Sequence, residues 1–501
     1  MRLFPLAVGL AIVGSVMIHT GTVRAGLWAG VAKEDITNRE AGPVNDPLWV
    51  KALVLKDERT AVAIVTVDAV AIAEIGSIRN EFLGNVRQAL QTDIGLEPAN
   101  LVVNASHCHG TVAPDVEART IAAVKAAWSN LTPVTVGVGV GSEDRVSTNR
   151  RLKLKNGREA DVRHAYSLPP DEEIEAVGPI DPEIGLLRLD REDGRTLAIV
   201  YNFACHPIQG VPGGGNTADM IGFASRVIED SFGDGAMAFF VQGCAGDINP
   251  VFYKDVAHPR DAETLGNLLG LSAMRAAKQI DCEPTDGVTF LNETLELPRA
   301  DLAPRIEAMK LEQLALLQSL RGTSLNLKTF LQLVGTRGVS GEFPSYYSHR
   351  YLHEQSLGRD DLQRLDAENR RNMEQYMKNI HVMEELTRLQ TNLRLLERHQ
   401  ARNVEAGKRT LDVEVTALRI GDFVLVTFPG ELTVRIGLNI KAASPHEHTF
   451  VAGYTNGYIF YSPTTEQLLN VGRAQEDSDC LLAPHWQPLF EEKVADLLKR
   501  L

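Results

Sequence analysis

Three histidines stand directly after apolar segments that are typical of buried strands. His107 and His109 follow residues 101–105, and His206 follows a second apolar segment. In an extended chain, side chains two residues apart point the same way, so both imidazoles of the first pair are expected to enter one pocket. Pro207 favours an extended backbone at His206, which keeps that side chain at its strand end. Two imidazoles with a carboxylate are a common ligand set for catalytic zinc, which keeps one position open for water.

Further polar groups follow two later apolar segments. Residues 423–428 lead into Glu431, and residues 449–452 lead into a tyrosine-rich stretch that ends at Tyr461. Ligands of α/β sheets bind outside the carboxyl ends of strands, so these groups are expected to converge with the histidines. Any one histidine alone is better explained as a hydrogen-bonded core or surface residue. It is their combination at several strand ends that favours a metal site.

The elements that must position these groups alternate along the chain. Such alternation predicts an α/β fold, with a mixed or mostly parallel sheet that has flanking helices and is largely covered on both faces. The expected strands are residues 61–70, 101–105, 197–204, 236–241, 423–428 and 449–452, and the expected helices are residues 77–90, 116–129, 218–230 and 261–278.

From about residue 303 to residue 402 the strand pattern is replaced by charged, helical sequence. Apolar residues recur there at spacings of three and four, which is typical of one stripe along a helix. The pattern predicts a helical hairpin inserted into the α/β domain, with residues 335–351 as its connecting loop. A lid, a dimer arm and a decoration are equally compatible with it. The two stripes are Met373, Tyr376, Ile380, Met383, Leu386, Leu389, Leu393 and Leu396, and Ile306, Met309, Leu311, Leu314, Leu317 and Leu320.

The N-terminal residues 1–25 are typical of a cleaved secretion signal. Arg2 precedes an apolar run over residues 3–18, and small residues end the segment. A membrane anchor is the competing interpretation, but this run is shorter than the ~20 residues that a bilayer requires. We therefore expect a secreted or periplasmic protein with no transmembrane span and one catalytic domain over residues 26–501.

Charge and cysteine content narrow the functional class. The formal net charge of −14 argues against nucleic acid as a partner, because phosphates require a basic surface. Five cysteines in 501 residues are too few for a disulfide scaffold, and the odd number leaves at least one thiol unpaired. We expect them to act mainly as small buried apolar residues. A small-molecule or lipid-like substrate is the expected partner, and the oligomeric state stays open.

Six short motifs occur in an order that resembles the neutral/alkaline non-lysosomal ceramidases. The resemblance covers roughly residues 28 to 480, interrupted by the helical insertion. It implies a secreted, zinc-dependent hydrolase that cleaves an amide bond in an N-acyl, ceramide-like substrate. The motifs are residues 30–37 (Gly-Val-Ala-Lys-Glu-Asp-Ile-Thr), 106–110 (Ser-His-Cys-His-Gly), 202–207 (Asn-Phe-Ala-Cys-His-Pro), 242–250 (Gln-Gly-Cys-Ala-Gly-Asp-Ile-Asn-Pro), 428–431 (Phe-Pro-Gly-Glu) and 456–461 (Asn-Gly-Tyr-Ile-Phe-Tyr).

The resemblance also implies a role for each site residue. One zinc ion would be held by His107, His206, Glu431 and Tyr461, with His109 as the neighbouring acid and base. Zinc lowers the pKa of bound water to around 7, and an imidazole can take its proton and return it to the leaving amine. A tyrosine ligand requires the metal to favour the phenolate, because the ordinary pKa of tyrosine is ~10.

Other residues belong to the expected substrate side of the site. By the same resemblance, Arg150 would contact the substrate carbonyl or the developing oxyanion. Asp247 would either orient a ligand histidine or cap a turn. Two positions depart from the family pattern: Asn249 stands where ceramidases carry a serine, and Arg473 stands where they place a tyrosine. The metal ligands therefore match the family, while the substrate-facing residues differ.

Three rival interpretations follow from the same residues. The first is a zinc hydrolase of another amide or an ester, and the second is a non-catalytic exported protein that binds metal. The third is a cysteine hydrolase that uses Cys108 or Cys205. Adjacent cysteine and histidine side chains point in opposite directions along a strand, which disfavours the third.

Overall fold

The computed structural model describes residues 26–501, apart from residues 162–167, 286, 345–346 and 471–473. The predicted signal segment and Arg473 therefore lie outside the described residues. Among the helices that are described, none combines the length and the apolar character needed to cross a membrane.

The core contains a mixed sheet of eight strands in the order β12-β11-β10-β5-β1-β2-β3-β4. Only β11–β12 and β3–β4 pair in parallel, and the other neighbours are antiparallel. The prediction of a mixed sheet is confirmed, although most neighbouring strands in it are antiparallel. Its strands are β1 (Leu27–Asp35), β2 (Trp49–Lys56), β3 (Ala61–Val67), β4 (Leu101–Ala105), β5 (Thr132–Ser142), β10 (Glu183–Arg191), β11 (Thr196–Phe203) and β12 (Met237–Gln242).

A second sheet of four strands packs face to face against the first. Its strands are β14 (Val288–Pro298), β15 (Thr410–Ile420), β16 (Phe423–Thr427) and β18 (Thr449–Ala452), in that order. One apolar cluster fills the space between the sheets, with Leu53 and Phe239 from the first and Leu425 and Phe450 from the second. The expectation of a sheet that is covered on both faces, with flanking helices, is confirmed; on one face of each sheet the cover is the other sheet.

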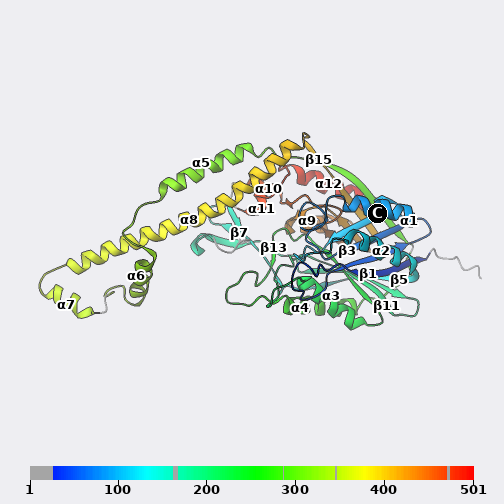
Figure 1. Ribbon diagram of the computed structural model, residues 1–501, viewed down its shortest axis with the longest axis horizontal. Helices are drawn as coiled ribbons and strands as arrows, with labels where there is room; N and C mark the ends of the chain where they lie inside the picture. Colours follow the sequence, from blue (N-terminus) through cyan, green and yellow to red (C-terminus); the bar gives the residue numbers. More distant parts are fainter. Residues whose placement is uncertain (1–25, 162–167, 286, 345–346, 471–473) are drawn as a thin grey trace, which may run out of the picture.

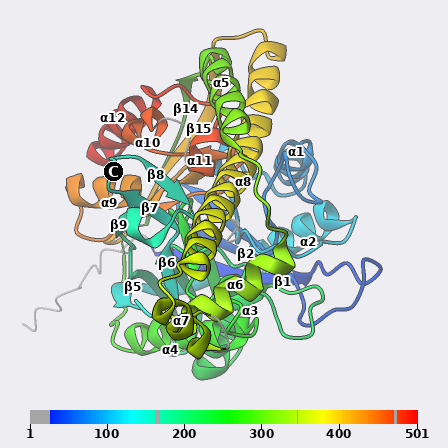
Figure 2. The same cartoon turned by 90° about the vertical axis from the view of Figure 1, so that its left-hand side faces the viewer.

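Helices cover the two outer faces, which gives four layers (Figures 1 and 2). The pairs α3–α4 and α9–α12 lie on opposite sides of the strands. Helices α3 and α4 approach closely, since a Cβ atom at Gly266 would lie only 2.4 Å from the Met220 carbonyl oxygen. The outer helices are α1 (Phe82–Ile94), α2 (Val116–Ser129), α3 (Asp219–Phe232) and α4 (Ala262–Ala277) on the large sheet, and α9 (Val434–Ala443) and α12 (Trp486–Arg500) on the small one.

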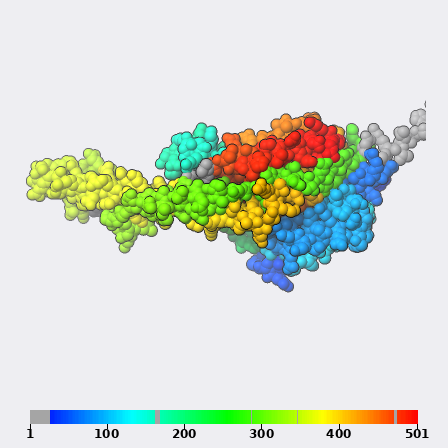
Figure 3. Space-filling view, turned by 90° about the horizontal axis from the view of Figure 1, so that it is seen from above, coloured from blue at the N-terminus to red at the C-terminus, as the bar shows by residue number. Residues whose placement is uncertain are grey.

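Between β14 and β15 the chain forms a helical arm that projects from the α/β body (Figures 1 and 3). It consists of α5 (Ala303–Ser319), α6 (Leu327–Val339), α7 (Ser348–Ser356) and α8 (Asp361–Glu405). At about 1.5 Å per residue, the 45 residues of α8 span about 68 Å. The prediction of an inserted helical hairpin is confirmed.

Two details of the arm differ from expectation. The predicted loop over residues 335–351 is wrong, because α6 and α7 occupy much of it. The predicted stripe on α5 packs only near the body, where Ile306 and Met309 meet apolar residues of α8. Leu311 and Leu314 farther out are 69% and 52% exposed.

Short elements complete the framework and lie mostly around the strand ends. They are β6 (Ser147–Asn149), β7 (Arg151–Leu154), β8 (Glu159–Asp161), β9 (Ile174–Val177), β13 (Ile248–Pro250), β17 (Glu431–Leu432), β19 (Tyr461–Ser462), α10 (Thr465–Leu469), α11 (Gln475–Ser478) and two 3-10 turns, Pro98–Asn100 and Asp171–Glu173.

Candidate metal centre

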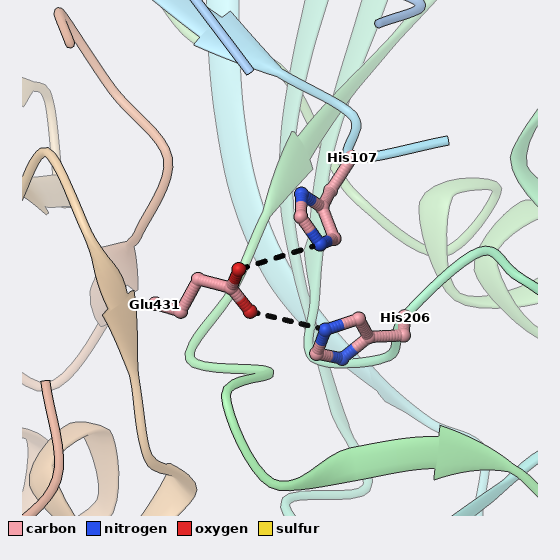
Figure 4. Close-up of side chains that lie close together, drawn as sticks. All are labelled: His107, His206 and Glu431. Atoms are coloured by element: carbon pink, nitrogen blue, oxygen red, sulfur yellow. Dashed lines mark hydrogen bonds and ion pairs between the residues drawn. The ribbon is translucent and has the colours of Figure 1, made fainter. Parts of the chain in front are cut away.

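His107, His206 and Glu431 meet at one point, although their segments are far apart in sequence (Figure 4). They follow strands β4, β11 and β16. All three side chains are buried, and their ligand atoms lie within 4.8 Å of one another. His206 Nε2 lies 3.1 Å from Glu431 Oε2, and His107 Nε2 lies 3.6 Å from Glu431 Oε1. The carboxylate thus faces the same ring nitrogen of both histidines.

The second ring nitrogen of each histidine contacts a backbone carbonyl. His107 Nδ1 lies 2.5 Å from the Val70 oxygen, and His206 Nδ1 lies 2.9 Å from the Ile248 oxygen. A carbonyl only accepts, so each Nδ1 must carry the hydrogen. In the neutral imidazole, Nε2 then presents its lone pair. Such outer contacts are what orient histidine ligands in metal sites.

The charges of the cluster call for a cation. Burial lowers the pKa of His107 to about 4 and also lowers the pKa of His206, so both imidazoles are neutral at pH 7. Burial alone would raise the pKa of Glu431, but the hydrogen bonds that Tyr458 and Tyr454 donate to its two oxygens favour the charged carboxylate. Two lone pairs therefore face a carboxylate, and a metal ion between them would satisfy all three groups.

The spacing fits zinc. Zinc binds histidine nitrogen and carboxylate oxygen at about 2.0–2.2 Å with tetrahedral geometry, which places its ligand atoms about 3.4 Å apart. The separations of 3.1 and 3.6 Å from Glu431 to the two histidines lie on either side of that value. The residues present thus fit the ion that the sequence suggests.

Three tyrosines surround the carboxylate. The hydroxyl of Tyr454 donates to Glu431 Oε2 at 3.1 Å, and the hydroxyl of Tyr458 donates to Oε1. Tyr461 is the direct partner of Glu431 in the parallel pairing of β17 and β19. Of these three tyrosines, only Tyr461 was expected as a ligand from the sequence. The tyrosine-rich stretch indicated that Tyr454 and Tyr458 could lie near the site. It did not indicate which oxygen of Glu431 each hydroxyl would contact.

Arg150 is buried and faces Tyr461. Its Nη2 donates to the Tyr461 hydroxyl at 3.1 Å, and its Nε donates to Glu476 Oε1 at 2.7 Å. Its Nη1 donates to Asn249 Oδ1 at 2.9 Å, so this amide holds the arginine. At 1% exposure, Arg150 is placed to act on the Tyr461 oxygen. Glu476 is a site residue that sequence analysis missed, since no local pattern links positions 326 residues apart.

Asp247 caps a helix and does not contact a ligand histidine. Its Oδ1 accepts from the backbone nitrogen of Val434 at 2.8 Å, in the first turn of α9. The hydrogen bond to His206 comes instead from the carbonyl of the next residue, Ile248. The other expected role was the cap of a turn, whereas the capped backbone belongs to a helix 187 residues along the chain. Backbone packing is tight here, because a Cβ atom at Gly246 would lie 2.6 Å from the Glu431 carbonyl oxygen.

The base of the arm contacts the segment behind the site. Arg305 of α5 donates to the Asp477 carbonyl at 3.0 Å. His399 of α8 lies 2.7 Å from Asp479 Oδ1, and the Asp479 carbonyl accepts from the Tyr461 backbone nitrogen at 3.1 Å. The arm thus helps to fix the residues that hold Tyr461.

His107 does not have the extended backbone that was expected. Its φ of +67° lies in the left-handed region, which non-glycine residues rarely adopt. The His107 and His109 rings nevertheless lie near each other, with centroids 5.7 Å apart. Tyr454 and Asn456 also have positive φ, at 54° and 57°. Each such residue costs about 1–3 kcal/mol, a strain that clusters at functional sites.

The cysteines take no part in this cluster. All five are free, and Cys108 and Cys205 are fully buried. Burial raises the pKa of both thiols far above its usual value, so neither is a thiolate at neutral pH. Since the thiolate is the reactive form, the structure gives no support to a cysteine hydrolase.

We predict that the metal-free protein loses stability between pH 6.5 and pH 4. Because burial lowers the folded-state pKa of His107 from 6.5 to about 4, the folded state binds fewer protons than the unfolded chain in this window. Acidification therefore favours unfolding, by an amount on the order of 3 kcal/mol. Urea unfolding of chelator-treated protein across this range measures the effect. If the free energy of unfolding of His107→Gln depended on pH as steeply as that of the wild type, His107 would not be the group responsible.

Comparison with known proteins supports the fold. No protein-family profile and no curated sequence matches the chain. Among solved structures, neutral ceramidase from Pseudomonas aeruginosa is similar, with a TM-score of 0.58 and 17% identity over 95% of this chain and 75% of that one. A ceramidase complexed with C2 is similar too, with a TM-score of 0.57 and 16% identity over 95% of this chain and 76% of that one. The chain therefore has the neutral ceramidase fold.

Proposed function

We propose that this chain, which shares the neutral ceramidase fold, is a secreted zinc-dependent hydrolase that cleaves an amide bond in an N-acyl substrate. The observation that carries the proposal is the buried His107–His206–Glu431 cluster, in which two neutral imidazole lone pairs face a carboxylate. The likeness to ceramidases adds support for a lipid-like, N-acyl substrate. The predicted signal segment supports export.

In this proposal His107, His206 and Glu431 hold one zinc ion, with Tyr461 as the fourth ligand. When bound, zinc supplies Lewis acidity and lowers the pKa of a coordinated water towards neutrality. Arg150 holds the Tyr461 oxygen and, as a cation, favours its phenolate form.

His109 is the proposed acid and base. It is exposed, lies beside His107 and lines a cavity of about 320 Å³. In that position its imidazole can accept a proton from water as the acyl carbon is attacked, and then deliver it to the leaving nitrogen. The acyl group leaves as a carboxylic acid and the other half leaves as an amine.

The test combines metal content with turnover. Purified protein is expected to contain one zinc per chain and to hydrolyse N-acyl sphingosine or simpler N-acyl amides. Chelation should remove the activity, and added zinc should restore it. Parallel assays on esters show whether the enzyme is instead an ester hydrolase. Bound zinc without turnover of any of these substrates would point to a metal-binding protein, and full activity after complete zinc removal would refute the proposal.

We predict that His109→Ala keeps its zinc but loses about a hundredfold in kcat, the usual contribution of a positioned acid or base. The pH–rate profile of the variant should also lose the limb that His109 supplies. His353→Ala, which removes an exposed histidine of the arm, is the matched control and should behave as wild type. A variant that loses its zinc would instead show that His109 is needed for metal binding.

A further inference from the structure

The cavity beside His109 has features that the proposed amide hydrolysis does not explain. It is bounded by the segment after His206 and by the loop that leads to α4. Lys254, Arg260 and Tyr253 line it from that loop, and Gln209 lines it from the other side. Its wall therefore includes His109 and Pro207, which are close in sequence to the metal cluster, and two cationic residues.

The position of His109 indicates which half of the substrate occupies this cavity. In the proposed reaction His109 gives a proton to the leaving nitrogen, so that nitrogen must lie within hydrogen-bond reach of its imidazole. His109 is itself part of the cavity wall. The amine half of the substrate therefore extends into the cavity.

The charges of the cavity wall favour an anionic amine half. Among the described residues, neither Lys254 nor Arg260 forms an ion pair. The acids beside them in sequence are engaged elsewhere: Asp255 contacts His258 at 2.9 Å, and Asp261 accepts from the Thr264 backbone at 3.1 Å to cap α4. Lys254 Nζ lies over the Tyr253 ring, 5.2 Å from its centroid, and both cations line the cavity without an acidic partner in the described part of the chain.

The single carboxylate of the cavity wall is already satisfied. Asp219 is buried and accepts hydrogen bonds from the backbone nitrogens of Gln209 at 3.2 Å, Gly210 at 2.7 Å and Met220 at 2.8 Å. Three donors stabilise this charge within the protein. It therefore does not serve as the partner of the two cations.

Gln209 is part of the cavity wall, but its amide is held within the protein. Its side chain is only 3% exposed, and its Nε2 donates to the Phe252 carbonyl at 3.4 Å. This contact fixes the orientation of the amide, because a carbonyl can only accept. Its Oε1 is buried without a hydrogen-bond partner in the described structure. A donor in the cavity therefore cannot reach this oxygen, and the cations are what characterise the ligand side of the cavity.

We propose that this cavity binds an amine half that bears a carboxylate, so that the substrate is an N-acyl amino acid. This inference rests on the proposed amide hydrolysis and specifies its substrate class. Arg260 and Lys254 bind the carboxylate. Water adds its oxygen to the acyl carbon, the C–N bond breaks, and the nitrogen takes the proton from His109. The products are a fatty acid and a free amino acid.

Two substrates that differ in one group test the proposal. N-dodecanoylglycine and N-dodecanoylethanolamine share the acyl chain and the amide, but one ends in a carboxylate and the other in a hydroxyl. The wild type is expected to prefer the glycine conjugate by at least roughly tenfold in kcat/KM, the usual scale of a charge-assisted hydrogen bond. Arg260→Gln should bring the ratio towards one. Arg275→Gln, an exposed arginine on α4 outside the cavity, should leave the ratio as in wild type.

A preference for the ethanolamine conjugate, or a ratio that Arg260→Gln does not change, would overturn the proposal. If neither compound is hydrolysed, the amide hydrolase itself is in question, and binding then decides the inference. Calorimetry should still detect N-dodecanoylglycine binding, weakened roughly tenfold by Arg260→Gln. Equal binding to both proteins, or none to the wild type, contradicts the anionic subsite.

Discussion

Glu431→Gln is expected to yield a folded protein that lacks zinc and has at least a ~10³-fold lower kcat/KM. Glutamine keeps the shape of the side chain but removes its negative charge. The two neutral imidazoles that face position 431 then lack the anionic ligand with which they would bind a cation. Loss of the metal removes several kcal/mol of transition-state stabilisation, and about 4 kcal/mol corresponds to a factor of 10³. Metal analysis and turnover of the same preparation measure both effects.

The control for this variant is Glu447→Gln, which changes an exposed glutamate in the same way. It should keep wild-type zinc content and turnover. One of the Tyr454 and Tyr458 hydroxyls can still donate to the amide oxygen at position 431, and the other can rotate to accept from the amide nitrogen, so the variant should remain folded by circular dichroism. Zinc binding equal to wild type in Glu431→Gln would exclude this residue as a ligand.

Arg150→Met is expected to lower the free energy of unfolding by about 3–5 kcal/mol, because it leaves a buried carboxylate without its main partner. Arg150 Nε lies 2.7 Å from Glu476 Oε1, and the two side chains are 1% and 0% exposed. Methionine fills a similar volume without the charge. Urea denaturation of wild type and variant at pH 7 measures the difference.

Two further variants show whether the loss has this cause. Adding Glu476→Gln to Arg150→Met should recover part of the stability, since the unpaired charge is then gone. Arg195→Met breaks a similarly short pair with Asp193 at 2.6 Å, but its side chains are 55% and 48% exposed. It should therefore change stability by less than about 1 kcal/mol. Equal losses for the buried and the exposed pair would contradict the argument.

The strands and their polar ends were predictable because buried strands are continuous and apolar. Strands β4 and β18 have the predicted boundaries, and the polar residues after them lie at the site. What covers each strand was not predictable. Leu53 contacts the second sheet and Val54 belongs to the cluster beneath the helices, yet both are equally apolar and equally buried. Only the three-dimensional pairing distinguishes the two faces.

The centre of the site was predictable, but its supports were not. His107, His206 and Glu431 have the residue types of a metal site and follow strands. Glu476 carries no such signal, since its role depends on Arg150 at the other end of the chain. The left-handed backbone of His107 was not predictable either. It occurs together with hydrogen bonds from the Ser106 and His107 backbone nitrogens to the carbonyls of residues 67 and 69, and no local sequence motif indicates these contacts.

The slender arm has a consequence for how the molecule moves through water. A rod of about 68 Å attached to a rounded body increases drag far more than it increases mass. The protein should therefore diffuse and sediment more slowly than a sphere of equal weight, and it should elute early from a sizing column even as a single copy. Scattering or sedimentation methods that separate shape from mass are accordingly the sound way to count its subunits.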